Sequence, residues 1–306
     1  MPRDVGLISR LSVETDGPPV TQAIQLAAGL ESSRCLVTVR PIDDHYKPTL
    51  TMLDDHGRAS AYVKLGWTLG TADLVRVEAS ALQQVAGRLG PDLASPRVLA
   101  AGNDPWDRPF CATAPLPGSL RRSSRQLPSP RLMRDLAGPV TRVSADAILS
   151  GWDANPASSS RRHLVRAARS MLTRHWRDGV ASGRAHGDWV PWNTATRNGR
   201  MVAWDWEHFR ELAPLGLDAL HWTVFSARSL DSCAWADAYA AALDSHDSSS
   251  VLPVERADRA ALALYHATEL LLKSERLRER GGVEPFPVDD IVADLLRRGA
   301  GGRSDG

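Results

Sequence analysis

Residues 185–193 read AHGDWVPWN, and residues 201–207 read MVAWDWE. Between these two stretches lies Asn198-Gly199, a pair that is typical of the tight two-residue turn of a β-hairpin. Apolar residues lie on both sides of the turn, at Ala195 and at residues 201–204, as expected of strands that pack on a core. The sequence therefore predicts a loop, a short strand, a tight turn and a second strand that ends at an acidic residue.

Three polar side chains in these stretches, Asp188, Asn193 and Asp205, would meet at one end of the predicted hairpin. Two carboxylates and an amide offer hard oxygen ligands, which suit Mg²⁺. One carboxylate would remain free to accept a proton from a hydroxyl group. The residues alone thus indicate a magnesium site beside a general base.

The motif His-Gly-Asp, followed by four residues and Asn and then by Trp-Asp-Trp-Glu, resembles the signature of the aminoglycoside phosphotransferase and choline kinase-like family. The resemblance implies an α+β, two-lobed protein-kinase-like fold, with a small antiparallel β N-lobe that carries one helix and a larger, mainly helical C-lobe. It implies that Asp188 orients the acceptor hydroxyl and takes its proton. It also implies that Asn193 and Asp205 hold the Mg²⁺ ions that bridge the nucleotide phosphates.

The first hundred residues contain short apolar, β-branched stretches that predict strands, at residues 34–40, 49–53 and 59–65. Residues 71–89 carry apolar side chains at helical spacing, and Thr71 is placed to cap that helix. Two further strands are predicted near residues 97–100 and 110–114. Together these segments predict a small antiparallel sheet with one helix.

Lysine occurs at only three positions, Lys47, Lys64 and Lys273, whereas the other 34 basic residues are arginine. Kinase-like folds need a lysine on the third strand, paired with a glutamate on the next helix, to bind the α- and β-phosphates. Lys64 lies on the third predicted strand, and Glu78 lies on the helix that follows. The resemblance therefore implies that Lys64 and Glu78 position the nucleotide.

The predicted strand at residues 110–114 resembles the one that leads into the linker between kinase lobes. Backbone groups at Thr113 and Ala114 would bind the nucleotide base there. Asp218 resembles the downstream Asp of the family, which steadies the catalytic loop through hydrogen bonds. A glycine-rich phosphate loop is missing between the first two strands, and Asp43 in that segment would repel phosphate if it faced it.

Four tryptophans flank the motif, and core packing is the simplest explanation for each of them. Trp189 or Trp192 could instead form a wall for the acceptor. His186 is interpreted as a structural anchor of the loop, and Glu207 either adds a metal contact or is solvated.

A Pro-rich passage marks the predicted boundary between the lobes near residue 116. Residues 1–115 would form the nucleotide-binding lobe, and residues 116–306 the helical catalytic and acceptor-binding lobe. Helices are predicted at residues 163–176, 258–280 and 289–298, and the tail at residues 299–306 is predicted to be disordered.

The 306 residues carry a net charge of +1, which argues against a protein held on nucleic acid by bulk charge. The sequence contains no apolar run of about 18 residues, the length that a membrane-spanning helix needs. Its three cysteines are widely spaced and indicate neither a disulfide framework nor a zinc site. A cytoplasmic setting is expected. Residues 116–184 carry a net charge of +9 and residues 231–306 a net charge of −5, most simply as solvated helix faces.

We expect a Mg²⁺-dependent phosphotransferase that moves the γ-phosphate of ATP or GTP to a hydroxyl of a small molecule. Aminoglycoside-, macrolide-, sugar- and amino-alcohol-like acceptors all remain open, and the sequence does not indicate an oligomeric state. The alternative is a catalytically silent nucleotide-binding module that acts through a protein partner. A protein kinase is disfavoured, because Gly187 stands where such enzymes have Arg before the catalytic Asp.

Overall fold

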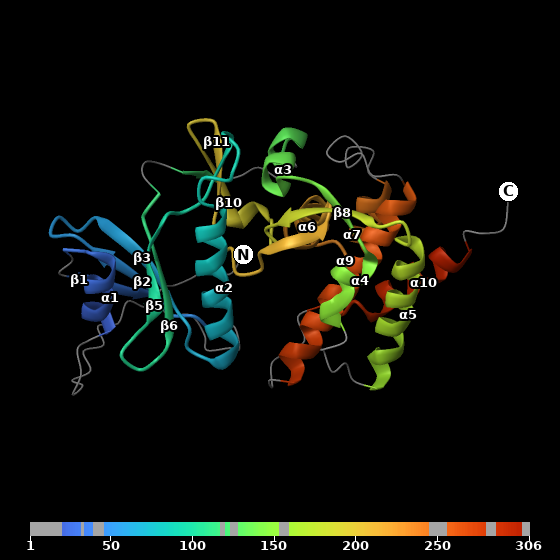
Figure 1. The fold of residues 1–306 in the computed structure, drawn as a ribbon, viewed down its shortest axis with the longest axis horizontal. Coiled ribbons are helices and arrows are strands. Elements are labelled where there is room, and N and C mark those ends of the chain that lie inside the picture. The colour runs from blue at the N-terminus through green and yellow to red at the C-terminus, as the bar shows by residue number, and fades with distance from the viewer. Residues whose placement is uncertain are drawn as a thin grey trace. The chain divides into compact units, whose positions relative to one another are not determined.

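The structure, a computed structural model, describes residues 20–31, 34–38, 46–116, 120–122, 128–152, 159–244, 256–279 and 286–301. The chain divides into two compact units, and Figure 1 labels most of their elements. The first comprises Met1–Arg88, Ala94–Leu120 and Val202–Phe209, and the second Leu89–Leu93, Arg121–Met201 and Arg210–Gly306. The lobe boundary near residue 116 stays a prediction, and Asp43 lies outside the described residues.

The first unit is built on a five-stranded antiparallel sheet in the order β1-β2-β3-β6-β5. Its strands are β1 (Arg34–Thr38), β2 (Thr49–Leu53), β3 (Ala59–Leu65), β5 (Val98–Asn103) and β6 (Pro109–Thr113). The strands predicted at residues 49–53 and 59–65 are confirmed at both ends. Apolar and polar side chains alternate along these strands because one face of the sheet is buried, with Met52, Ala61 and Val63 among its apolar side chains.

Two helices belong to this unit, α1 (Val20–Ala28) and α2 (Leu69–Val85). The sequence analysis did not predict α1, whose Ile24 is fully buried in the apolar cluster of the sheet. The prediction that Thr71 caps α2 is wrong, because Thr68 is the N-cap. The Thr68 hydroxyl accepts a hydrogen bond from the Thr71 backbone N–H, and the Thr71 hydroxyl accepts one from the Thr68 backbone N–H. This capping box satisfies two donors at the start of the helix.

The predicted hairpin is present, with β10 (Thr194–Arg197) and β11 (Arg200–Ala203) adjacent in a sheet of order β4-β11-β10-β7. Its remaining strands are β4 (Leu93–Ala94) and β7 (Arg121–Arg122). Asn198 and Gly199 both have positive φ, 48° and 77°, as the tight turn requires. A third sheet orders β12 (Arg210–Pro214), β9 (Val180–Ala185) and β8 (Thr141–Val143).

The rest of the second unit is mainly helical, which confirms the predicted α+β class. Its helices are α3 (Pro130–Ala137), α4 (Ala145–Leu149), α5 (Ser159–His175), α6 (Leu217–Leu230), α7 (Trp235–Asp244), α9 (Arg256–Glu279) and α10 (Asp289–Gly301), with 3-10 turns at Ser150–Trp152 and Pro191–Asn193. The prediction of disorder from residue 299 is wrong up to Gly301, because α10 continues and packs Gly299 against Met171. Residues 302–306 lie outside the described part.

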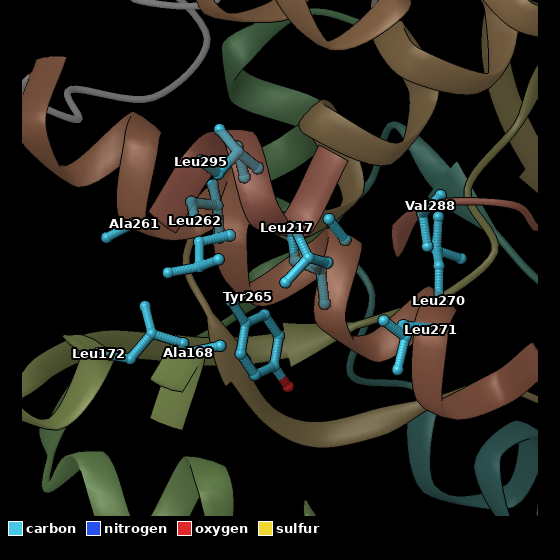
Figure 2. Packing of buried hydrophobic residues seen from close by; sticks show 14 of the residues in the cluster. Ala168, Leu172, Leu217, Ala261, Leu262, Tyr265, Leu270, Leu271, Val288 and Leu295 are labelled. Carbon is cyan, nitrogen blue, oxygen red and sulfur yellow. The ribbon is translucent and has the colours of Figure 1, made fainter. Parts of the chain in front are cut away.

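Helix α9 is central to the second unit. Residues 261–268 are buried without a break, so the helix is surrounded on all sides rather than amphipathic. Figure 2 shows Leu262 and Tyr265 of α9 with Leu172 of α5 and Leu295 of α10 in one cluster. No described helix combines the length and apolar character needed to span a membrane.

Candidate functional site

The polar face of the first sheet is set by strand register. Lys64 of β3 pairs with Thr49 of β2 on one side and with Cys111 of β6 on the other. Two residues earlier on β3, Tyr62 pairs with Thr113 of β6. Because side chains alternate along a strand, all five point away from the apolar cluster. They line a cavity of about 350 Å³ whose other walls include Glu78, Ala114, Leu116 and Trp204.

Lys64 lies between two carboxylates in this unit. Its Nζ is 2.8 Å from Glu78 Oε1 and 2.6 Å from Asp205 Oδ1. Burial by itself would lower the pKa of Lys64, but the charges of Glu78 and Asp205 raise it above its ordinary value. The lysine is therefore charged at any physiological pH, and a bound phosphate would have to share it with these carboxylates.

Asp205 occupies the left-handed region of the backbone, with φ of 68°, which is uncommon outside glycine. Its carboxylate, that of Glu78 and that of Glu207 place ligand atoms within 4.8 Å of one another. Glu207, which the sequence left open, is 9% exposed and ion-paired with Lys47. It is thus a buried member of this acidic group and not a solvated side chain.

Thr113 and Ala114 both line the cavity, at the end of β6. The Thr113 hydroxyl donates to the Tyr62 carbonyl oxygen at 3.3 Å. The Ala114 amide donates to the carbonyl oxygen of Arg97 at 2.8 Å. A base that contacts Ala114 would therefore use its carbonyl oxygen, because the N–H is already bonded.

In the second unit, the 3-10 turn Pro191–Asn193 brings Asn193 back onto Asp188. Asn193 Nδ2 donates to Asp188 Oδ2 at 2.8 Å and to the Asp188 carbonyl oxygen at 3.1 Å. Since the amide nitrogen is used in this way, Oδ1 is the atom of Asn193 that could serve as a ligand. A hard amide oxygen of this kind fits a magnesium ion.

The loop is anchored by Asp218, the first-turn residue of α6. Its carboxylate accepts from the backbone N–H of His186 at 2.8 Å and of Gly187 at 2.9 Å, which confirms the hydrogen bonds expected of it. Burial raises the pKa of Asp218, although nearby His186 and the two N–H groups act in the opposite direction. Gly187 has φ of 80°, so the turn at this position favours glycine.

The aromatic side chains near the loop divide into two kinds. His186 and Trp189 are fully buried and pack edge to face, 5.5 Å between ring centroids. The expectation that Trp189 could form an acceptor wall is therefore wrong, because the side chain is needed in the core. Trp192 is 44% exposed, so its role as a wall stays a prediction.

Sequence reasoning missed His221, His266 and Tyr239. His221 Nε2 lies 3.1 Å from Asp188 Oδ1, and the other two residues continue the hydrogen bonding behind it. The only sequence signal was the position of His221, three residues after Asp218 and so on the same face of a helix. Nothing in the sequence places α7 and α9 beside it.

The predicted site residues thus fall into two groups. Lys64, Glu78 and Asp205 are in contact in the first unit, where Thr113 and Ala114 share their cavity. Asp188 and Asn193 are in contact in the second unit. The joint binding of metal by Asn193 and Asp205 stays a prediction.

Comparison with known proteins addresses the fold. No family model and no curated protein sequence matches the chain. Among solved structures, a thermostable mutant of aminoglycoside phosphotransferase APH(4)-Ia, in a ternary complex with AMP-PNP and hygromycin B, matches with a TM-score of 0.63 at 14% identity, over 93% of this chain and 100% of that one. Choline kinase LicA from Streptococcus pneumoniae matches with a TM-score of 0.54 at 14% identity, over 91% and 98%. Amicoumacin kinase hAmiN, in complex with AMP-PNP, Ca²⁺ and Ami, matches with a TM-score of 0.53 at 10% identity, over 91% and 92%.

These identities establish a shared fold and no more. The alignments span nearly the whole of both chains in each case, so the likeness is one of complete architecture and not of a single motif. The chain has the protein-kinase-like fold of the aminoglycoside phosphotransferases and choline kinase.

Proposed function

We propose that the chain is a Mg²⁺-dependent phosphotransferase that moves the γ-phosphate of ATP or GTP to a hydroxyl group of a small molecule. The observation that carries the proposal is the placement of Lys64 against Glu78 and Asp205 beside a cavity. Only three lysines occur in the chain, and this one would contact the phosphates, a role that kinase-like folds give to a lysine on the third strand. The structures of the same fold include complexes with AMP-PNP, which supports a nucleotide as the donor.

The cavity of the first unit suits the nucleotide. Its volume of about 350 Å³ is within the usual range for small-molecule sites. The Ala114 carbonyl would accept from the base, the apolar side chains of Leu116 and Trp204 would cover its faces, and Lys64 would contact the phosphates. This assignment makes Lys64 and Glu78 the positioning pair and gives the Thr113–Ala114 backbone to the base.

Magnesium would be held by Asn193 and Asp205, whose oxygen atoms are the hard donors that this ion prefers. The ion would neutralise charge that develops on the transferred phosphoryl group. A complex of amicoumacin kinase with Ca²⁺ supports a divalent ion in this fold. Asn193 supports the assignment through its amide, since Nδ2 is already bonded to Asp188.

Asp188 would orient the acceptor hydroxyl and take its proton. The hydroxyl oxygen forms a bond to the γ-phosphorus while the bond from that phosphorus to the β,γ-bridging oxygen breaks, which releases the nucleoside diphosphate. The proton of the hydroxyl moves to Asp188. Positioning and charge neutralisation would supply most of the rate acceleration.

The acceptor belongs to the class of hydroxylated small molecules, by analogy with the antibiotic and choline kinases of the same fold. The three cysteines are unpaired, as is usual in the cytoplasm, where we place the reaction. Nucleic acid and membranes are not proposed as partners.

Nucleotide binding and hydrolysis test this proposal together. We expect wild-type protein to bind Mg·AMP-PNP in calorimetry and to hydrolyse ATP or GTP slowly in a Mg²⁺-dependent manner. Asp205→Asn should abolish that hydrolysis, whereas the control Asp55→Asn, in an exposed hairpin turn of the same unit, should not change it. Hydrolysis that survives in Asp205→Asn contradicts the metal assignment, and binding without any turnover favours the silent module.

A further inference from the structure

A chain of hydrogen bonds runs from Asp188 into the core of the second unit. Asp188 Oδ1 lies 3.1 Å from His221 Nε2, and His221 Nδ1 lies 2.9 Å from His266 Nε2. His266 Nδ1 in turn lies 2.7 Å from the hydroxyl of Tyr239. The loop and three helices, α6, α9 and α7, each contribute one member.

The three residues behind Asp188 are shielded from water. His221, His266 and Tyr239 are 5%, 3% and 2% exposed. Phe225 stacks on the His221 ring, with centroids 4.1 Å apart and an interplanar angle of 18°. Buried polar groups of this kind persist when each one is hydrogen-bonded, and here both nitrogens of each ring are.

The ionised Asp188 sets the direction of the chain. A carboxylate only accepts, so His221 must carry its proton on Nε2. When the His221 ring is neutral, its Nδ1 accepts, and His266 then carries its proton on Nε2. The Nδ1 of His266 accepts in turn, and the Tyr239 hydroxyl donates to it. Every donor in the chain therefore points toward Asp188.

Burial favours a neutral His266 ring and a protonated Tyr239 phenol. Burial is the largest cause that lowers the pKa of His266 well below its ordinary value, so this ring is neutral. Burial also raises the pKa of Tyr239 well above its ordinary value, so the phenol keeps its proton. Asp218, on the same helix as His221, is also in electrostatic contact with His221.

We propose that His221 is a positioning residue for Asp188, and that His266 and Tyr239 fix the direction in which it donates. With Asn193 on Oδ2 and His221 on Oδ1, both oxygens of the carboxylate are held by donors. The orientation of Asp188 is thereby set before an acceptor arrives. This inference rests on the proposed function, because it concerns the base of that reaction.

The chain does not lead the proton away. It ends at Tyr239 inside the core, and each ring already donates toward Asp188, so no acceptor nitrogen faces the carboxylate. The proton taken from the acceptor stays on Asp188 until the product leaves. The role of the chain is to orient the Asp188 carboxylate from its buried side.

Two variants of His221 separate positioning from packing. His221→Phe keeps an aromatic ring against Phe225 but removes the donor, and we expect kcat to fall about ten- to hundredfold with KM for the nucleotide nearly unchanged. His221→Gln can donate to Asp188 and accept from His266, so it should restore most of kcat. His175→Gln, on a surface ion pair with Asp258, is the control and should behave as wild type.

NMR of the ¹⁵N-histidine-labelled protein at neutral pH tests the chain without substrate. We expect a scalar coupling across the hydrogen bond between His266 and His221, with the proton on His266 Nε2 and both rings neutral. A proton on His221 Nδ1, or a charged ring, overturns the proposed direction. A His221→Phe variant with wild-type kcat overturns the positioning role. If wild-type protein transfers no phosphate, the proposed function fails and the positioning role with it, while the coupling still decides whether the directed chain exists.

Discussion

Replacement of Lys64 by Met tests the ion pair on which nucleotide positioning rests. The Lys64 side chain is 25% exposed and that of Glu78 is 6% exposed, so the variant leaves a buried carboxylate without its cation. Breaking a buried pair costs about 3–5 kcal/mol. The loss of unfolding free energy has an upper limit, because protonation would remove the buried charge. Protonating a glutamate of ordinary pKa at pH 7 costs about 3.7 kcal/mol. We therefore expect Lys64→Met to lose about 3 kcal/mol of unfolding free energy at pH 7.

The same reasoning predicts how the loss changes with pH. At pH 5 the neutralisation of a glutamate costs only about 1 kcal/mol, so the difference between Lys64→Met and wild type should shrink to about that value. The double variant Lys64→Met/Glu78→Gln carries no buried charge at this pair, and its stability relative to wild type should not depend on pH in this range. Urea unfolding at pH 5 and pH 7 measures all three proteins.

Nucleotide binding completes the test, because stability and binding should separate. We expect both the single and the double variant to lose binding of Mg·AMP-PNP, although the double variant recovers stability. A Lys64→Met protein as stable as wild type at pH 7 would refute the ion-pair reasoning. A double variant that binds the nucleotide as tightly as wild type would refute the positioning role of Lys64.

Three further outcomes follow from the buried groups. Because the folded-state pKa of His266 is lowered, the unfolded chain binds more protons below about pH 6.5, and the free energy of unfolding should fall there by up to about 1.4 kcal/mol per pH unit. His266→Gln should flatten that slope in thermal unfolding measured from pH 5 to 7. An unchanged slope contradicts the assignment. Burial and the charge of Glu78 raise the pKa of Cys111 to about 12. Maleimide at pH 8 should therefore leave Cys111 unlabelled in native protein, because the thiol is not ionised. Rapid labelling of Cys111, identified by mass spectrometry, would contradict the raised pKa. Asp218→Asn leaves one of the two loop N–H groups facing an amide donor. The variant should therefore lose about 2–3 kcal/mol of unfolding free energy, measured with urea. A loss below about 0.5 kcal/mol would show that the loop does not need this anchor.

Local pattern was enough to predict much of the first unit and of the motif region. The strand at 59–65 has the two-residue alternation that a half-buried strand needs, and the turn at Asn198-Gly199 has the residues that its positive φ values favour. The contact of Lys64 with Glu78, which the family resemblance implied, is present, and the strand and helix that carry the two residues were predicted from local pattern. These features depend on near neighbours in sequence.

The features that sequence reasoning missed depend on distant segments. The His221–His266–Tyr239 chain joins three helices, and no local pattern shows that α7 and α9 meet α6 there. Helix α9 gave no information on its orientation, since it is buried all round. The cap of α2 was misplaced by three residues because Thr68 and Thr71 are equally good cap residues in isolation.

The central claim is that Asp188 accepts the proton of an acceptor hydroxyl during phosphate transfer. The most direct measurement is transfer of the labelled γ-phosphate of ATP or GTP to a panel of hydroxylated small molecules, with Asp188→Ala beside wild type. The account predicts a labelled phosphate ester with wild-type protein and none with Asp188→Ala, which should still bind the nucleotide. Equal transfer by both proteins, or no transfer by wild type to any hydroxyl in the panel, would contradict it.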